Sequence, residues 1–192
     1  ELIHIIGNND NNLQSAKMLI DNFRHIQWHT LYDFWKELGE ALQKQGYKIF
    51  QSVQNEKIDL LVHGGPKQRK IDLDMIIITN RELPIHINAE YEDWLFWGIY
   101  EDKDKAKIPE IYKEAIKELT DRNDKYQKEG NWICWKYLSC NEDENIVCSD
   151  FSEEGTFKLI SPKHRSKIVE NIISEINQFV MELKNIASKS NL

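Results

Sequence analysis

Residues 91–100, YEDWLFWGIY, and residues 131–140, NWICWKYLSC, are the two stretches that decide the fold. Each stretch holds two tryptophans three positions apart, in a run that is dense in aromatic side chains. Aromatic runs of this kind are typical of strands, and tryptophan supplies much of the buried area in a core or at an interface. We expect these four residues to pack the sheet against a helix, with a ligand site of stacked rings as the alternative. They are Trp94, Trp97, Trp132 and Trp135.

The first quarter of the chain has a helical period. Apolar residues recur at three- and four-residue steps from Asn12 to the KQG sequence, where Gly46 suits a left-handed cap. The pattern predicts one long helix, or two helices that meet near His29, because polar Gln27 interrupts the stripe. Residues 1–7 are expected to form the end of a helix, with a strand as the alternative. The stripe consists of Leu13, Ala16, Ile20, Phe23, Leu31, Phe34, Leu38 and Leu42.

Residues 47–100 change to short apolar runs that are separated by turn residues. Strands with such brief connections must pair as antiparallel hairpins or meanders. The expected strands are YKIFQSV (47–53), KIDLLVHG (57–64), KIDLDMIIIT (70–79), LPIHINAEYE (83–92) and WLFWGIY (94–100).

The last half of the chain returns to helices. A helix is expected from Pro109, followed by a strand at 131–139 and an acidic loop, NEDEN, at 141–145. Residues 157–160, FKLI, predict a strand that runs into a long closing helix, with Ser161 as its N-cap and Pro162 as its first residue. The fold class is therefore α+β, with an antiparallel sheet of four to six strands packed against long N-terminal and C-terminal helices.

Composition and length favour one globular domain. The 192 residues are 41% hydrophobic and 30% charged, with a net charge of −7, so a uniformly basic nucleic-acid face is not expected. The domain is expected to be helical in 1–46, strand-rich in 47–100, and to hold a helix, a strand and the closing helix in 101–192. Three cysteines and no membrane-length apolar run indicate a cytoplasmic protein without a membrane partner, in which Cys134 is a core residue. The opening Glu1 suggests a fragment of a longer protein.

One candidate metal site lies in the first helical stretch. His25, His29 and Asp33 are four residues apart, a spacing that can place imidazole and carboxylate ligands on one helix face. At about 100° per residue, however, they lie opposite the apolar stripe and face solvent. An ordinary charged surface explains them as well, so no cofactor is assigned to the chain.

A second candidate is acidic. Asp74 lies on one expected strand, and Glu90 and Glu92 lie on the next. A divalent-metal nuclease places carboxylates in this way, with a lysine near them to orient the attacking water. The lysine is missing here, so we expect no catalytic residue in this segment. Acidic residues on the solvent-facing side of an antiparallel sheet explain the pattern as well. A self-contained metal-dependent nuclease stays as the alternative.

Two short basic clusters could bind nucleic acid through a local patch. The first follows Gly64-Gly65 at a hairpin tip, and the second opens the closing helix. The residues are Lys67, Arg69, Lys70, Lys163 and Arg165.

Four segments together resemble the C-terminal half of bacterial PD-(D/E)XK-superfamily nuclease-like proteins. They are HTLYDFWKELGEAL (29–42), DWLFWGIY (93–100), NWICWKYL (131–138) and FKLISPKHRSKIVENIISEI (157–176). The resemblance covers nearly the whole chain and rests on packing motifs, and the family's catalytic Asp and Glu-x-Lys find no match.

The resemblance implies a non-catalytic recognition, regulatory or dimerisation module of a nuclease acting on DNA, in the setting of phage defence. The Mg²⁺-binding half would lie upstream. The implied partners are that nuclease half or another protein, nucleic acid through a local patch, or a second copy in a homodimer. A binding protein with an aromatic pocket is the remaining alternative.

Overall fold

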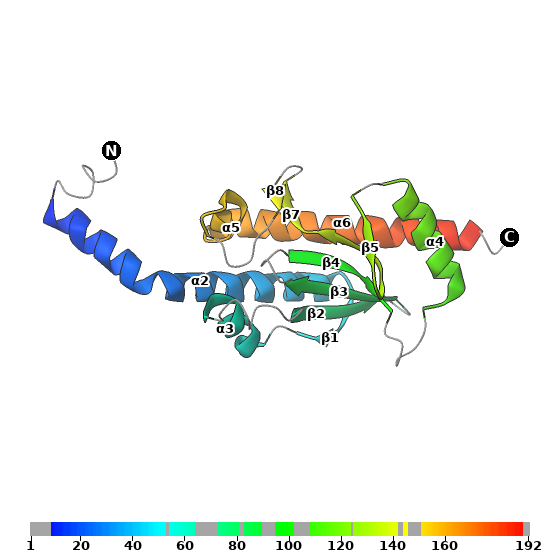
Figure 1. The fold of residues 1–192 in the computed structure, drawn as a ribbon, viewed down its shortest axis with the longest axis horizontal. Coiled ribbons are helices and arrows are strands. Elements are labelled where there is room, and N and C mark those ends of the chain that lie inside the picture. Colours follow the sequence, from blue (N-terminus) through cyan, green and yellow to red (C-terminus); the bar gives the residue numbers. More distant parts are fainter. Residues whose placement is uncertain are drawn as a thin grey trace.

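A computed structural model of the chain describes residues 9–52, 54–63, 73–80, 83–89, 95–101, 108–123, 125–141, 144–145 and 151–189. It shows an α+β fold in which long helices at both ends of the chain accompany an antiparallel sheet, as the sequence predicts (Figure 1). The helices are α2 (Asp10–Lys44), α3 (Asn55–His63), α4 (Glu110–Asp121), α5 (Glu154–Lys158) and α6 (Pro162–Lys189). The strands are β1 (Lys48–Gln51), β2 (Leu73–Asn80), β3 (Leu83–Ala89), β4 (Leu95–Tyr100), β5 (Gln127–Glu129), β6 (Trp132–Tyr137), β7 (Ser139–Asn141) and β8 (Glu144–Asn145).

Within the described residues the main sheet has six strands in the order β1-β2-β3-β4-β6-β5, and every neighbouring pair is antiparallel. Consecutive strands pair from β1 to β4. The connections β2–β3 and β3–β4 are too short for a parallel crossover, and β1 also pairs with β2 although α3 lies between them in the sequence. The chain then leaves the sheet through α4 and returns with the β5–β6 hairpin. This return places β6 beside β4, so the two tryptophan-rich strands are neighbours.

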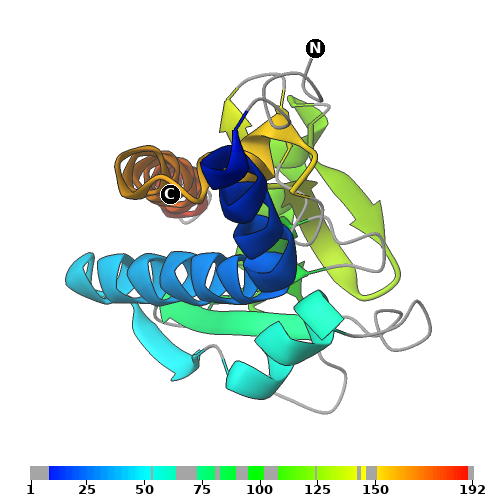
Figure 2. The ribbon, with the colours of Figure 1, turned by 90° about the vertical axis from the view of Figure 1, so that its left-hand side faces the viewer.

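The long helices pack side by side and share one core with the sheet. Figure 2 looks almost along α6, with α2 beside it. Trp97 of β4 is fully buried in this core, which confirms the packing role expected for it, and Trp35 of α2 is fully buried there as well. Cys134 of β6 is also buried there, as its position between two tryptophans predicts.

Helix α2 is continuous from Asp10 to Lys44, so Gln27 does not break it. The Asn9 side chain accepts a hydrogen bond from the Asn12 backbone N–H at 2.9 Å, and Gly46 has φ +85° just beyond the C-cap. Only the second half of the predicted apolar stripe is buried, because the first turns extend beyond the rest of the fold (Figure 1). The exposed large apolar residues of this part are Leu13, Met18, Leu19, Ile20 and Phe23.

Two predicted strands are wrong. Residues 55–63 form α3, because Ile58 and Val62, four positions apart, both turn into the core against α2. The alternation of apolar residues in KIDLLVHG fits a strand equally well, so only packing decides between the two. Residues 154–158 form α5 and FKLI ends it in a turn, with Leu159 buried and Phe157 exposed.

Two smaller differences concern boundaries. Pro109 is the N-cap of α4 and not its first residue, and part of the NEDEN segment belongs to the small β7–β8 hairpin. The start of α6 at Pro162 is as predicted. The helix predicted for residues 1–7 lies outside the described residues.

Candidate functional site

The alternation of side chains along β4 separates its aromatic residues onto two faces. Trp97 faces α6: its ring centroid lies 5.1 Å from that of Phe179, and its Nε1 donates a hydrogen bond to Glu175 Oε1. Phe96 and Tyr100 belong to the opposite face, which we call the outer face of the sheet. The outer face is therefore a second aromatic surface, separate from the helix-facing core.

The outer aromatic cluster consists of His86 from β3, Phe96 and Tyr100 from β4, and Trp132 and Trp135 from β6. Ring centroids are 5.1 Å apart for Phe96 and Trp132, 5.5 Å for Phe96 and Trp135, and 5.1 Å for Tyr100 and Trp132. The planes of these pairs are inclined by 63–72°, the edge-to-face geometry that aromatic rings prefer. His86 lies edge-on to Trp132 at 5.8 Å.

Gly98 permits this arrangement. It is the cross-strand partner of Trp135 on the outer face. A Cβ atom at position 98 would lie 2.4 Å from the Cys134 carbonyl oxygen and 2.7 Å from the Trp135 Cβ. Because a strand backbone atom cannot move aside cheaply, only glycine lets Trp135 lie this close over β4.

The β5–β6 turn closes one side of the cluster. Gly130 has φ +58°, which allows the two-residue connection between Glu129 and Trp132. Asn131 then donates from Nδ2 to the Tyr100 hydroxyl at 3.2 Å, and its carbonyl accepts from the Glu101 N–H at 2.9 Å. The turn is thereby fixed against the end of β4.

A pocket of about 300 Å³ lies between this turn and the outer aromatic cluster. Phe96 and Trp135 are buried, whereas Tyr100 and Trp132 are half-buried, so their rings retain accessible surface. The described lining residues are Phe96, Tyr100, Glu129, Gly130, Asn131, Trp132 and Trp135.

The chemistry of the pocket is aromatic and acidic. Four of its described lining residues are aromatic, Glu129 supplies a carboxylate, and none of them is lysine, arginine or histidine. Ring faces carry negative electrostatic potential and attract cations, as a carboxylate does. The arrangement therefore suits a positively charged or neutral planar guest and disfavours a phosphate.

Larger hollows occur elsewhere in the described structure but lack this convergence. One of about 670 Å³ lies along the exposed sides of α2 and α6, near Ala41 and Asn177. Another of about 480 Å³ lies beside α4, where two of the lining cations pair with carboxylates: Lys136 lies 2.9 Å from Glu175 and Arg122 pairs with Glu118.

The four predicted tryptophans take different positions. Trp97 is fully buried against α6 and offers no surface to a ligand, whereas Trp132 and Trp135 line the pocket. Trp94 lies outside the described residues. The sequence interpretation missed Tyr100, Glu129 and the turn between them, although the Gly130-Asn131 dipeptide before an aromatic run is a hairpin signal.

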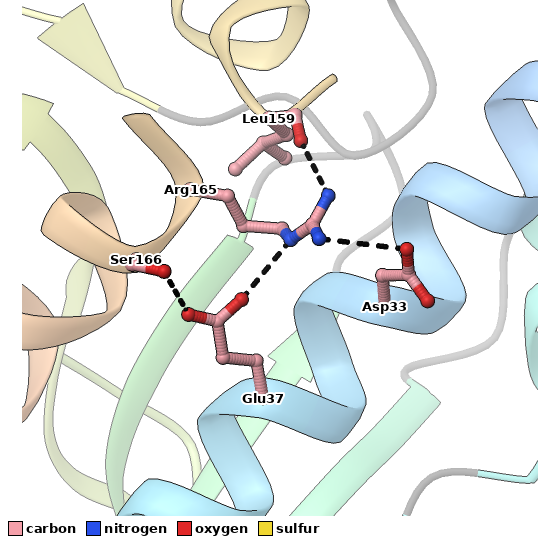
Figure 3. Close-up of polar contacts among 5 residues, drawn as sticks. All are labelled: Asp33, Glu37, Leu159, Arg165 and Ser166. Atoms are coloured by element: carbon pink, nitrogen blue, oxygen red, sulfur yellow. Dashed lines mark hydrogen bonds and ion pairs between the residues drawn. The ribbon is translucent and has the colours of Figure 1, made fainter. Parts of the chain in front are cut away.

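Arg165 is engaged inside the fold (Figure 3). Its Nε lies 3.1 Å from Glu37 Oε2, its Nη2 lies 3.4 Å from Asp33 Oδ2, and its Nη1 donates to the Leu159 carbonyl at 3.0 Å. Ser166 donates to the other oxygen of Glu37. Arg165 thus joins α6 to α2, and its charge is already compensated.

The remaining basic candidates are not brought together with Arg165. Lys163 is exposed at the start of α6. Lys67, Arg69 and Lys70 lie outside the described residues, so a patch formed by both clusters stays a prediction.

The acidic candidates are only partly described. The Asp74 backbone lies in β2, paired with Asn88 of β3, and its side chain is outside the described set. Glu90 and Glu92 follow β3 and also lie outside the described residues. The alternative metal centre therefore stays a prediction.

His25 and His29 are exposed and in contact, with 3.0 Å between their Nε2 atoms. Asp33 is turned to Arg165 and does not join them. Within the described residues no group of three or more His, Cys, Asp or Glu side chains is arranged to hold a metal.

Comparison with family models, with curated proteins and with solved structures found no match. Among the described residues, no helix combines the length and the apolar character needed to cross a membrane.

Proposed function

We propose that this chain is a non-catalytic recognition module that binds an organic cation, such as a methylated ammonium or guanidinium group, in the pocket of the outer aromatic cluster. The observation that supports this proposal is the composition of the pocket. Aromatic rings from β4 and β6 and the Glu129 carboxylate converge on it, without a basic residue among its described lining residues.

The energetics suit a weak and selective interaction. A cation over an aromatic ring gains about 0.5–2 kcal/mol, depending on how far it is desolvated. Two or three such rings together with one partly exposed carboxylate correspond to a dissociation constant on the order of 0.1–1 mM for a small probe. A cation carried by a peptide or larger partner would add contacts around the rim.

The test is an NMR titration of the purified chain with Nε-trimethyllysine, followed through the indole N–H signals. We expect saturable shifts at Trp132 and Trp135, and loss of binding in Trp132→Ala. Trp28→Ala is the matched control, because Trp28 lies on α2, where it stacks on Tyr32 and bonds Asp59. Glu129→Gln should weaken binding and reduce its dependence on salt.

The neutral carbon isostere of trimethyllysine provides the deciding comparison. It has the same shape without the charge, so it should bind at least about tenfold more weakly if ring electrostatics drive recognition. Equal binding of the two probes would overturn the cation assignment. Preferential binding of nucleosides or single-stranded oligonucleotides would instead assign the rings to base stacking.

The relation to nuclease-like proteins stays a prediction from the resemblance of packing motifs. The non-catalytic part of the proposal can be tested directly. The purified chain should not cleave DNA or RNA with Mg²⁺ or Mn²⁺, because the lysine that would orient the attacking water is missing beside Glu90 and Glu92. Metal-dependent cleavage that disappears in Asp74→Ala would overturn it and favour the self-contained nuclease.

A further inference from the structure

Two histidine side chains meet on the exposed side of α2. His25 and His29 are one helical turn apart, and their Nε2 atoms are 3.0 Å apart. Their rings are inclined by 78°, with centroids separated by 4.3 Å. The two nitrogens are within hydrogen-bond distance of one another on the exposed side of the helix, apart from both the core and the aromatic pocket.

This spacing matches that of two ligands of one metal ion. Imidazole nitrogens bind a transition metal at about 2.0–2.1 Å, so two of them lie about 2.9 Å apart at a 90° angle and about 3.3 Å apart at a tetrahedral angle. The observed 3.0 Å lies within this range. A metal that binds both nitrogens would replace the hydrogen bond between them.

The surroundings hold one of the two rings in place. Trp28 lies edge-on to His29, with 5.1 Å between the ring centroids. Trp28 itself is fixed by stacking on Tyr32 and by a 2.6 Å hydrogen bond from its Nε1 to Asp59 of α3. The site therefore lies beside a side chain that contacts with α2 and α3 residues hold in place.

The ligand set determines the class of metal. Two neutral imidazoles favour borderline divalent ions, in the order Cu²⁺ above Ni²⁺ and Zn²⁺, over Mg²⁺ and Ca²⁺, which require oxygen ligands. Asp33, the next residue of the series, pairs with Arg165 at 3.4 Å, so the described part of the chain offers the site His25 and His29 as ligands. The other coordination positions are open to water or to an external donor.

The geometry assigns to His25 and His29 a two-histidine site for a divalent transition-metal ion, and Cu²⁺ is the ion that it should bind most tightly. The second imidazole binds intramolecularly once the first has captured the ion, so the pair binds far more tightly than either residue alone.

The experiment is a Cu²⁺ titration of the folded chain by calorimetry and electron paramagnetic resonance. The parent carries His4→Gln, so that this residue near the amino terminus does not compete. We expect one saturable site with a two-nitrogen signal. Replacement of His25 or His29 by Gln should weaken it about a hundredfold. His63→Gln, which removes an exposed histidine at the end of α3, is the matched control and should change nothing.

A second readout is local to the site. Cu²⁺ quenches a nearby indole, so the parent should lose Trp28 fluorescence on binding, and a Trp28→Phe variant should show much less quenching. Circular dichroism establishes that each variant is folded, which is expected because both histidines are exposed. Retention of the tight site in the His25→Gln/His29→Gln double variant, or a signal with a single nitrogen ligand, would overturn the assignment.

Discussion

The indole Nε1 of Trp97 donates a hydrogen bond to Oε1 of Glu175 at 2.5 Å and so joins the middle of β4 to α6. The other oxygen of Glu175 lies 2.9 Å from Nζ of Lys136 on the neighbouring strand β6. One carboxylate therefore satisfies a fully buried donor and a mostly buried cation on two adjacent strands. This link fixes the position of α6 over the sheet.

Removal of that carboxylate should destabilise the fold. Glu175→Ala leaves the Trp97 N–H and the Lys136 ammonium without this partner, at an expected cost of about 2 kcal/mol in the free energy of unfolding. Urea denaturation measures the effect. Glu170→Ala, at an exposed position of the same helix, is the control and should stay within about 0.5 kcal/mol of the parent. Equal urea midpoints for the two variants would contradict the role of Glu175.

Arg165 should be a stability residue. Its side chain is 11% exposed, so Arg165→Ala removes a hydrogen bond to Glu37 and an ion pair with Asp33 on α2, together with a hydrogen bond to the Leu159 carbonyl after α5. We expect a loss of about 2–3 kcal/mol in the free energy of unfolding. Lys163→Ala removes an equal charge from the exposed start of the same helix. A thermal melt in which both variants unfold at the same temperature would refute this assignment.

The two halves of α2 should differ in their tolerance to substitution. Leu38 is fully buried, so Leu38→Ala should cost about 2–5 kcal/mol through lost burial and the cavity left behind. Ile20 belongs to the same predicted stripe but is 76% exposed, so Ile20→Ala should cost no more than about 0.5 kcal/mol. Chemical denaturation of the two variants measures the difference. A large loss for Ile20→Ala would show that another part of the chain or a second copy covers this face.

Stability should fall in alkaline solution. Burial raises the pKa of Cys134 from 9.0 to about 12, and burial followed by the Glu175 carboxylate raises the pKa of Tyr126 above its ordinary 10.0. Above pH 9 the unfolded thiol ionises while the folded thiol stays protonated, so the unfolded state binds fewer protons. The Cys134 contribution is about 1.4 kcal/mol for each pH unit between 9 and 12.

Urea midpoints measured between pH 8 and pH 11 test this behaviour. The parent should lose stability steadily above pH 9, with a further loss above pH 10 as unfolded Tyr126 ionises. Cys134→Ala should be less stable throughout but show a shallower decline, because the thiol no longer contributes to it. An unchanged slope in Cys134→Ala would mean that the thiol does not contribute.

Local patterns predicted those features that a single element decides. The helical period ending at Gly46 and the Ser161-Pro162 helix start are both confirmed, because the residues of one segment decide each of them. The aromatic site could be predicted only in part. Trp132 and Trp135 were identified, but the residues that complete the pocket come from a turn and a neighbouring strand.

The sequence by itself determined the α+β class, the strand-rich middle and the two long terminal helices, since hydrophobic period is visible within one segment. Tertiary structure decided the rest. Packing against α2 made residues 55–63 a helix. Ile20 is exposed because the first turns of α2 extend beyond the rest of the fold, whereas Leu38 is buried. Tertiary packing also brought Arg165 to Glu37, 128 positions away. Contacts between distant residues depend on how whole elements pack, and no local period encodes them.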